Sequence, residues 1–278
     1  MPSFSVIIPT YGRPVFLADA LRSVAQQTIE NVEVIVVDDA SPVPVQLPAG
    51  SRAHLIRAKE NGGAASARNL GAATASGDVL TFLDDDDTWL PTRLEDAARG
   101  VAQAPIGISG QGGAPRRLYG NVHDTILDAT TPHLGATAIR REHWHPLNEE
   151  YRTCEDLVWW LEATRESEVY TVDRQGLRVR RHPGLRLGYG AEQRIADSLR
   201  LLDEFDDYFD SHPRAAAHRF RRIGLMQRAV GDLDGARRSH RAALRRRPNP
   251  RDLKHLVAAL PWPSVLTSRR QHDTQRQG

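Results

Sequence analysis

The chain has 278 residues, of which 26% are charged and 40% hydrophobic, and its formal net charge at pH 7 is +2. This length allows one large domain or one domain with an appendage, and the small net charge gives no reason to expect a nucleic-acid partner. A single cysteine, Cys154, excludes an internal disulfide, and no stretch approaches the roughly 18 consecutive apolar residues of a membrane span. Because the N-terminus lacks a signal-peptide pattern, a cytoplasmic protein is expected.

Strand and helix patterns alternate along the first half of the chain. Short β-branched runs predict buried strands at residues 4–9, 33–37, 54–57 and 79–83. Apolar residues at helical spacing predict helices from residue 14 onward, at about 64–75 and at about 91–103. This order predicts an α/β fold with a largely parallel mixed sheet flanked by helices.

Polar clusters follow three of the predicted strands. They are Thr10-Tyr11, Asp38-Asp39 and the run Asp84-Asp85-Asp86-Asp87. Parallel sheets bind ligands outside the carboxyl ends of their strands, so these clusters are expected to converge on one site. Four adjacent carboxylates repel one another, and a divalent cation such as Mg²⁺ or Mn²⁺, carrying a diphosphate, would compensate them. The alternative is a solvated acidic turn that caps a helix beginning near Pro91.

Four motifs carry a resemblance to a known family. They are Pro9-Thr10-Tyr11-x-Arg13-Pro14, Val37-Asp38-Asp39-Ala40-Ser41, Asn61-x-Gly63-x-x-x-Ala67-Arg68-Asn69 and Phe82-Leu83-Asp84-x-Asp86-Asp87. In this order and spacing they resemble the nucleotide-sugar-binding half of the inverting family 2 glycosyltransferases of the GT-A fold. The resemblance covers residues 3–100 and continues in a weaker form to about residue 190.

The resemblance implies a nucleoside-diphosphate-sugar donor, with a UDP-sugar foremost. Thr10 and Tyr11 would line the base, and Asp39 would accept a hydrogen bond from a base N–H. Gly63 would let the backbone approach the nucleotide. Asp38 could instead stiffen the turn, and Arg68 could instead pair with a carboxylate. The full set of residues expected at the donor is Pro9, Thr10, Tyr11, Arg13, Asp38, Asp39, Gly63, Arg68, Asp84, Asp85 and Arg180.

The same resemblance implies a metal, Mn²⁺ or Mg²⁺, at the aspartate run. Asp86 is expected as its direct ligand, with Asp84 reaching the ribose or the metal's waters. His182, in the Arg180-Arg181-His182 element, is a third ligand in this reading and a surface histidine in the alternative one.

Glu155-Asp156 resembles the family's acidic pair at the acceptor side. Asp156 would act as the general base that takes the proton of the attacking hydroxyl, and Glu155 would orient a sugar hydroxyl or Asp156 itself. Attack from the face opposite the leaving group inverts the anomeric centre. Both carboxylates also lie where they would stabilise a helix N-terminus, which is the structural alternative. The segment 133–137 resembles the entry to the acceptor site.

The expected domains are a GT-A glycosyltransferase domain over 1–190, a helical appendage over 191–265 and a disordered tail over 266–278. Within the first domain, residues 1–103 form the nucleotide-sugar-binding half and 104–190 the acceptor half. The appendage includes a stretch after Pro213 that resembles a tetratricopeptide-type helical hairpin. Its basic helices leave open a peripheral contact with the inner face of a membrane, and association into homo-oligomers is also left open.

Two hypotheses compete with a metal-dependent glycosyltransferase. One is a hydrolase that uses Asp86 and Asp156 on a glycosidic bond. The other is a non-catalytic nucleotide-sugar-binding or scaffold protein on the same fold. The sequence identifies neither the sugar nor the acceptor.

Overall fold

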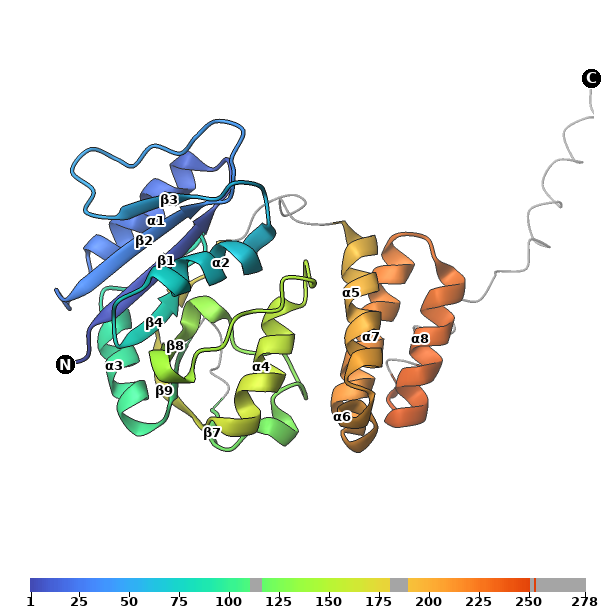
Figure 1. The fold of residues 1–278 in the computed structure, drawn as a ribbon. Coiled ribbons are helices and arrows are strands. Elements are labelled where there is room, and N and C mark those ends of the chain that lie inside the picture. The colour runs from blue at the N-terminus through green and yellow to red at the C-terminus, as the bar shows by residue number, and fades with distance from the viewer. Residues whose placement is uncertain (111–116, 181–189, 251–252, 254–278) are drawn as a thin grey trace, which may run out of the picture. The chain divides into compact units, whose positions relative to one another are not determined.

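A computed structural model describes residues 1–110, 117–180, 190–250 and 253 of the chain (Figure 1). Contacts divide it into two compact units, residues 1–206 and 207–278. The first unit includes helix α5 (Ala191–Glu204), which the sequence analysis had assigned to the C-terminal appendage. The reason is that α5 bonds to the segment before helix α4 (Glu155–Glu166).

The first unit is built on one mixed sheet of eight strands in the order β3-β2-β1-β4-β8-β6-β9-β7. Strands β3, β2, β1 and β4 are mutually parallel, and β8 runs antiparallel to both β4 and β6. The strands are β1 (Phe4–Thr10), β2 (Val32–Asp38), β3 (His54–Arg57), β4 (Val79–Phe82), β6 (Ile106–Gly110), β7 (Tyr119–Gly120), β8 (Thr137–Arg140) and β9 (Val169–Gln175). The predicted α/β class with a largely parallel mixed sheet is therefore confirmed.

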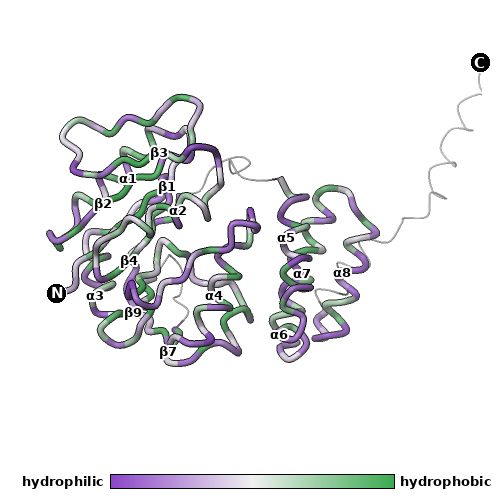
Figure 2. The backbone as a smooth tube through the Cα atoms, viewed as in Figure 1, coloured by the Kyte–Doolittle hydropathy of each residue, from purple (hydrophilic) through white to green (hydrophobic). Residues whose placement is uncertain are grey.

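Strand β1 lies at the centre of the parallel part of the sheet. It pairs with β2 on one side and β4 on the other, and all seven of its residues are buried. A strand covered on both faces reads as a continuous apolar run rather than an alternating one, and the sequence Phe-Ser-Val-Ile-Ile-Pro-Thr has that character. Figure 2 shows the hydrophobic residues running through these central strands.

Helices cover the sheet, and two very short strands and three single 3-10 turns complete the unit. The remaining helices are α1 (Pro14–Ala25), α2 (Gly63–Thr74) and α3 (Arg93–Gln103). The short strands β5 (Thr88–Trp89) and β10 (Leu177–Arg178) pair antiparallel with each other. The 3-10 turns are η1 (His123–Thr125), η2 (Leu134–Ala136) and η3 (Arg141–His143). The observed ranges agree closely with the predicted strands and helices of the first half.

The second unit holds the helical hairpin that the sequence suggested. Its helices are α6 (Asp206–Ser211, beginning one residue before the unit), α7 (Pro213–Ala229) and α8 (Leu233–Arg246). Asp232 caps α8 by accepting a hydrogen bond from the Gly235 amide at 2.8 Å. Gly224 of α7 allows the buried ring of His240 to approach, since an added Cβ would lie 2.8 Å from that ring. The likeness to a tetratricopeptide-type repeat stays a prediction.

No helix in the described ranges combines the length and the apolar character that crossing a bilayer requires. The basic segment 253–266, which suggested membrane contact, lies outside the described residues except for Leu253.

The packing of α3 on β6 depends on two facing glycines. A Cβ built on Gly107 would lie 2.9 Å from the Cα of Gly100, and the other nearest atoms are also backbone. We therefore expect Gly107→Ala to lower the free energy of unfolding by about 1–3 kcal/mol through overpacking. Urea unfolding measures the change. The exposed Ala102→Ser on the same helix is the control and should stay within about 0.5 kcal/mol of wild type. An unchanged midpoint for Gly107→Ala would contradict the close approach.

Candidate active site

The polar clusters after β1, β2 and β4 meet at one edge of the sheet. Parallel register sets Thr10 beside Asp38, and β4 ends at Phe82, just before the aspartate run. The Thr10 hydroxyl donates a 2.7 Å hydrogen bond to Asp85 Oδ2, which joins two clusters directly. The convergence expected from topology is thus present in the structure.

Arg13 neutralises the middle of the aspartate run. Its Nη2 lies 2.8 Å from Asp85 Oδ1 and its Nη1 lies 2.7 Å from Asp86 Oδ2. Asp85 is 1% exposed, and this burial raises its pKa to about 6 despite the opposing charge of Arg13. Both carboxylates therefore face the arginine that follows β1.

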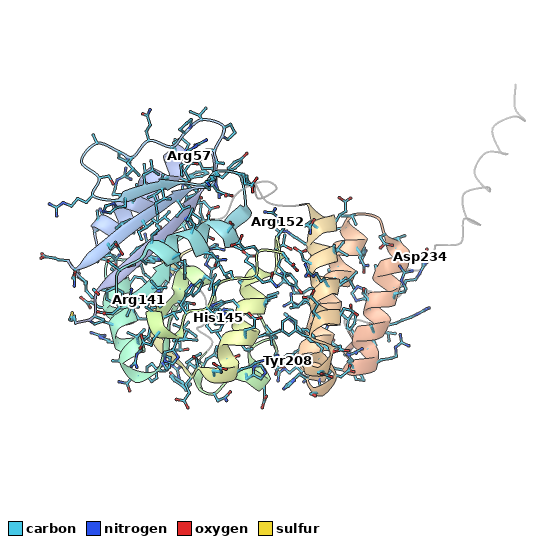
Figure 3. The ribbon with its side chains drawn as sticks, viewed as in Figure 1. Arg57, Arg141, His145, Arg152, Tyr208 and Asp234 are labelled. Carbon is cyan, nitrogen blue, oxygen red and sulfur yellow. The ribbon has the colours of Figure 1, made fainter. Side chains whose placement is uncertain are left out.

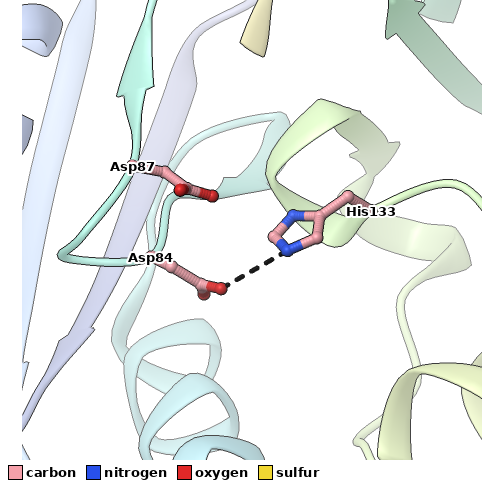
Figure 4. Close-up of side chains that lie close together, drawn as sticks. All are labelled: Asp84, Asp87 and His133. Atoms are coloured by element: carbon pink, nitrogen blue, oxygen red, sulfur yellow. Dashed lines mark ion pairs between the residues drawn. The ribbon is translucent and has the colours of Figure 1, made fainter. Parts of the chain in front are cut away.

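Asp84, Asp87 and His133 form a separate cluster (Figure 4). One ligand atom from each lies within 4.8 Å of the others, and His133 Nε2 lies 3.5 Å from Asp84 Oδ2. Burial and the charge of Asp84 raise the pKa of Asp87 to about 6, although the hydrogen bond from the Arg180 amide opposes this shift. Burial opposes ionisation of Asp84 as well, but Arg68 and His133 outweigh it and lower that pKa to about 2.

The donor atoms of this cluster suit a hard divalent cation. Carboxylate oxygens are the ligands that Mg²⁺ and Mn²⁺ prefer, and Asp84 and Asp87 provide them. His133 Nδ1 accepts a hydrogen bond from the Gly135 amide at 3.1 Å, so the neutral ring is assigned its proton on Nε2. A metal-bound histidine normally donates from its second nitrogen, which this bond prevents. The geometry thus fits a cation held by the two carboxylates, with His133 Nε2 3.5 Å from Asp84 Oδ2.

The predicted metal ligands differ from this cluster in two respects. The structure offers Asp87 beside Asp84, whereas Asp86 faces Arg13. His182 lies outside the described residues. The assignment of Asp86 therefore remains a prediction that the geometry does not favour.

Arg68 connects this edge of the sheet with helix α4. It is 6% exposed, its Nη2 lies 2.7 Å from Asp84 Oδ1, and its Nη1 lies 3.1 Å from Glu155 Oε1. Burial, with the neighbouring charge of Asp156, raises the pKa of Glu155 to about 7 even though Arg68 opposes the shift. Arg68, expected near the nucleotide, thus takes the alternative role of pairing with carboxylates.

Glu155 and Asp156 occupy the first turn of α4, as expected. Both side chains are partly buried, and Glu155 is held in place by its ion pair with Arg68.

The two aspartates after β2 organise the surrounding loops. Asp38 accepts hydrogen bonds from the amides of Ser41 (2.9 Å) and Val45 (3.2 Å) and pairs with Arg57, as the turn-stiffening alternative requires. Burial raises the pKa of Asp38, but the hydrogen bonds that its carboxylate accepts have the larger effect, so the pKa is lowered overall.

Asp39 accepts from the amides of Gly62 and Gly63 at 2.9 and 2.8 Å. Gly63 has φ +85°, a conformation that favours glycine. Burial raises the pKa of Asp39. Both of its oxygens already hold the loop at the start of α2, and the role of Asp39 towards a nucleotide base stays a prediction.

The remaining donor-side residues lie near this edge. Pro9 is buried within β1, and Tyr11 is 45% exposed beyond it. The backbone amide of Arg180 donates to Asp87 Oδ1 at 2.9 Å, and its Nε donates to the Asp86 carbonyl at 3.2 Å. Strand β10 pairs with β5, which follows the aspartate run directly, and this pairing positions Arg180 beside Asp86 and Asp87.

Sequence reasoning missed one long-range contact. The Arg152 guanidinium donates to the carbonyl of Gly62 and so reaches the loop before α2 (Figure 3). No local pattern marks Arg152, because the contact depends on the tertiary placement of the segment before α4.

The fold and this strand-end site define a GT-A domain of the glycosyltransferase type. Residues 5–125 match the family model "Glycosyl transferase family 2". An uncharacterized glycosyltransferase of Haemophilus influenzae is 43% identical over 103 residues, which cover 36% of this chain and 35% of the relative. The chain spans little more than a third of the length of the first curated relatives that it matches.

Solved structures share the fold. S. aureus TarS 1–349 in complex with UDP-GlcNAc has a TM-score of 0.60 at 17% identity, covering 92% of this chain and 90% of that one. The mannosyltransferase PcManGT from Pyrobaculum calidifontis, in complex with GDP-Man and Mn²⁺, has a TM-score of 0.59 at 18% identity, with coverages of 92% and 79%. At this identity the likeness establishes the fold alone.

Removing the Arg68 guanidinium leaves two carboxylates without their shared partner. Arg68→Met raises the folded-state pKa of Asp84 and Glu155, so the folded variant binds more protons than the unfolded chain. The variant's loss in free energy of unfolding, relative to wild type, therefore increases as the pH rises. We expect a loss of about 3–5 kcal/mol at pH 8 and a smaller one at pH 5, measured by urea unfolding.

Arg99→Met is the control for this change. The Arg99 side chain is 64% exposed, and its contacts with Glu95 and Asp96 are long, at 4.0 and 3.9 Å. Such exposed ion pairs contribute little, so little effect is expected at either pH. Equal losses at pH 5 and pH 8 for Arg68→Met would contradict the assigned ion pairs.

Proposed function

We propose that this protein is a divalent-metal-dependent, inverting glycosyltransferase that uses a nucleoside-diphosphate sugar. The observation that carries the proposal is the ion-pair chain of Asp84, Arg68 and Glu155, which joins a candidate metal site to the acidic pair on α4. The bound ligands of the two solved neighbours, UDP-GlcNAc in one and GDP-Man with Mn²⁺ in the other, support a donor of this class.

The donor diphosphate would lie at the aspartate run. Mn²⁺ or Mg²⁺ held by Asp84 and Asp87 would supply charge neutralisation for the departing diphosphate. His133 would hold Asp84 in orientation through its Nε2–H. Arg13 and Arg180 keep Asp85, Asp86 and Asp87 in place around the site. Thr10, Tyr11 and Asp39 would face the nucleoside.

Asp156 would serve as the general base. It removes the proton from the acceptor hydroxyl while that oxygen attacks the anomeric carbon, and the sugar–phosphate bond breaks on the opposite face, which inverts the centre. Glu155, fixed by Arg68, would orient a sugar hydroxyl or Asp156. A partly exposed carboxylate beside a fixed one suits this division, since the base must meet an incoming acceptor.

The acceptor and any larger assembly stay predictions. A glycan, a lipid-linked intermediate, a natural product or a peptide would each supply the hydroxyl. Contact of the basic C-terminal helices with a membrane and homo-oligomer formation are untested expectations of the sequence.

Titration calorimetry with UDP and GDP, with and without Mn²⁺, tests the donor side. We expect one nucleotide to bind, to require the metal, and to bind at least about 10-fold more weakly to Asp87→Asn. Asp86→Asn should weaken binding less, because Asp86 faces Arg13. The exposed Glu168→Gln serves as control and should bind like wild type. Metal-independent binding, or a larger loss for Asp86→Asn than for Asp87→Asn, would overturn the assigned site.

Asp156→Asn tests the base. The amide cannot accept the proton, so release of UDP from UDP-GlcNAc or of GDP from GDP-mannose should fall by about 10²–10⁴-fold. Nucleotide affinity should not change, because Asp156 lies outside the candidate metal cluster. Glu166→Gln, at the other end of α4, is the matched control. Retained turnover in Asp156→Asn would remove this residue from the mechanism.

A further inference from the structure

Helix α5 is hydrogen-bonded to the segment that leads into α4. Asp197 lies in the middle of α5 and is 3% exposed. Its Oδ2 accepts hydrogen bonds from the amide of Arg152 at 3.1 Å and from the amide and hydroxyl of Thr153 at 2.8 and 2.7 Å. Its Oδ1 accepts from Gln193 Nε2 at 2.8 Å, so both oxygens are used.

Two further contacts connect the same segment to α5. The Tyr151 hydroxyl donates to Glu204 Oε2 at 2.5 Å, and Cys154 Sγ lies 3.6 Å from Ser198 Oγ. Each of the four residues 151–154 is therefore bonded to this one helix.

The contacts with α5 fix the start of a helix that has no side-chain cap. Cys154 is the N-cap residue of α4, and its side chain makes no capping hydrogen bond. Helix starts usually depend on such a side chain to satisfy free amides and to fix the entry of the chain. Here the backbone that enters α4 is fixed by a buried carboxylate from another helix. Glu155 and Asp156 follow immediately, so their direction depends on that anchor.

The same segment also contacts the donor-side loop. Arg152, whose amide binds Asp197, extends its guanidinium to the Gly62 carbonyl. Gly62 in turn donates to Asp39. Asp197 thus lies at one end of a chain of bonds that sets the acidic pair of α4 against the loop after β2.

We propose that Asp197 is a positioning residue for the Glu155–Asp156 pair. Asp197 touches neither carboxylate; it holds the backbone of Arg152 and Thr153, from which α4 begins. This proposal rests on the function proposed above, in which Asp156 acts as the base. Catalysis is sensitive to such placement, since a shift of about 1 Å at a reacting group can cost about 100-fold in rate.

A purely structural role makes a different prediction. If Asp197 only stabilised the fold, its loss would weaken donor binding and turnover together. A positioning role affects turnover more than donor binding, because Asp197 bonds to Arg152, Thr153 and Gln193, none of which is predicted to bind the nucleotide.

The test compares Asp197→Ala, Asp197→Asn and the control Asp203→Ala in the full chain. Asp203 is exposed on the same helix. Release of UDP from UDP-GlcNAc or of GDP from GDP-mannose gives kcat, and calorimetry with the free nucleotide and Mn²⁺ gives the dissociation constant. We expect kcat of Asp197→Ala to fall about 10- to 100-fold while the dissociation constant stays within about threefold.

The conservative variant separates position from charge. Asp197→Asn keeps an acceptor oxygen for the two amides, so its kcat should lie between those of Asp197→Ala and wild type. Should Asp197→Ala fail to fold, a reduced kcat with unchanged affinity in Asp197→Asn carries the test. A kcat within twofold of wild type for the variants that fold, or a parallel loss of affinity, overturns the proposal.

Hydrogen exchange distinguishes this proposal from the function on which it rests. Asp197→Ala should speed amide exchange at residues 152–156 and leave β1 and β4 unchanged, whether or not a donor is turned over. If wild type releases no nucleotide from either donor, the proposed function fails. The exchange result still shows whether Asp197 holds the backbone that leads into α4. Unchanged exchange at residues 152–156 overturns the role of Asp197.

Discussion

The site depends on one buried guanidinium. Arg68 faces Asp84 from the loop after β4 and Glu155 from the start of α4, and it is almost fully removed from solvent. Burying a charge is costly unless the charge is paired, so Asp84 and Glu155 depend on this arginine to stay ionised in their positions. The interaction therefore fixes the distance between the donor edge of the sheet and the helix that carries the acidic pair.

Charge balance around Arg68 points to a further cation. Among the residues that the structure describes, the guanidiniums of Arg13, Arg68 and Arg180 contact this region. The carboxylates described there include Asp84, Asp85, Asp86, Asp87 and Glu155, with Asp156 next to Glu155. The excess of negative charge adds to burial in raising the pKa values of Asp85, Asp87 and Glu155. A divalent cation between Asp84 and Asp87 would offset that excess, in agreement with the role proposed for it.

The sequence predicts the strands and their convergence better than it predicts the partners within the site. Apolar runs define β1, β2 and β4, and the strand-end rule brings their polar clusters together. Which of Asp84 to Asp87 faces which partner depends on the turn after β4, and four identical side chains carry no information about it. The placement of α5 was missed for a similar reason. Its amphipathic pattern resembles that of the other C-terminal helices, and no local pattern reveals that Asp197, Ser198 and Glu204 contact the segment before α4.

His133 lies beside Asp84 because strand β8 runs antiparallel to both of its neighbours in the sheet, β4 and β6. Strand β8 pairs antiparallel with β4, with Ala138 opposite Thr81, so β8 begins at the edge where β4 ends. The turn η2 immediately precedes β8 and carries His133 to Asp84 at that same edge. A parallel strand in this position would have placed those residues at the opposite edge. The antiparallel insertion of β8 is thus what lets the second half of the unit complete a site that the first half begins.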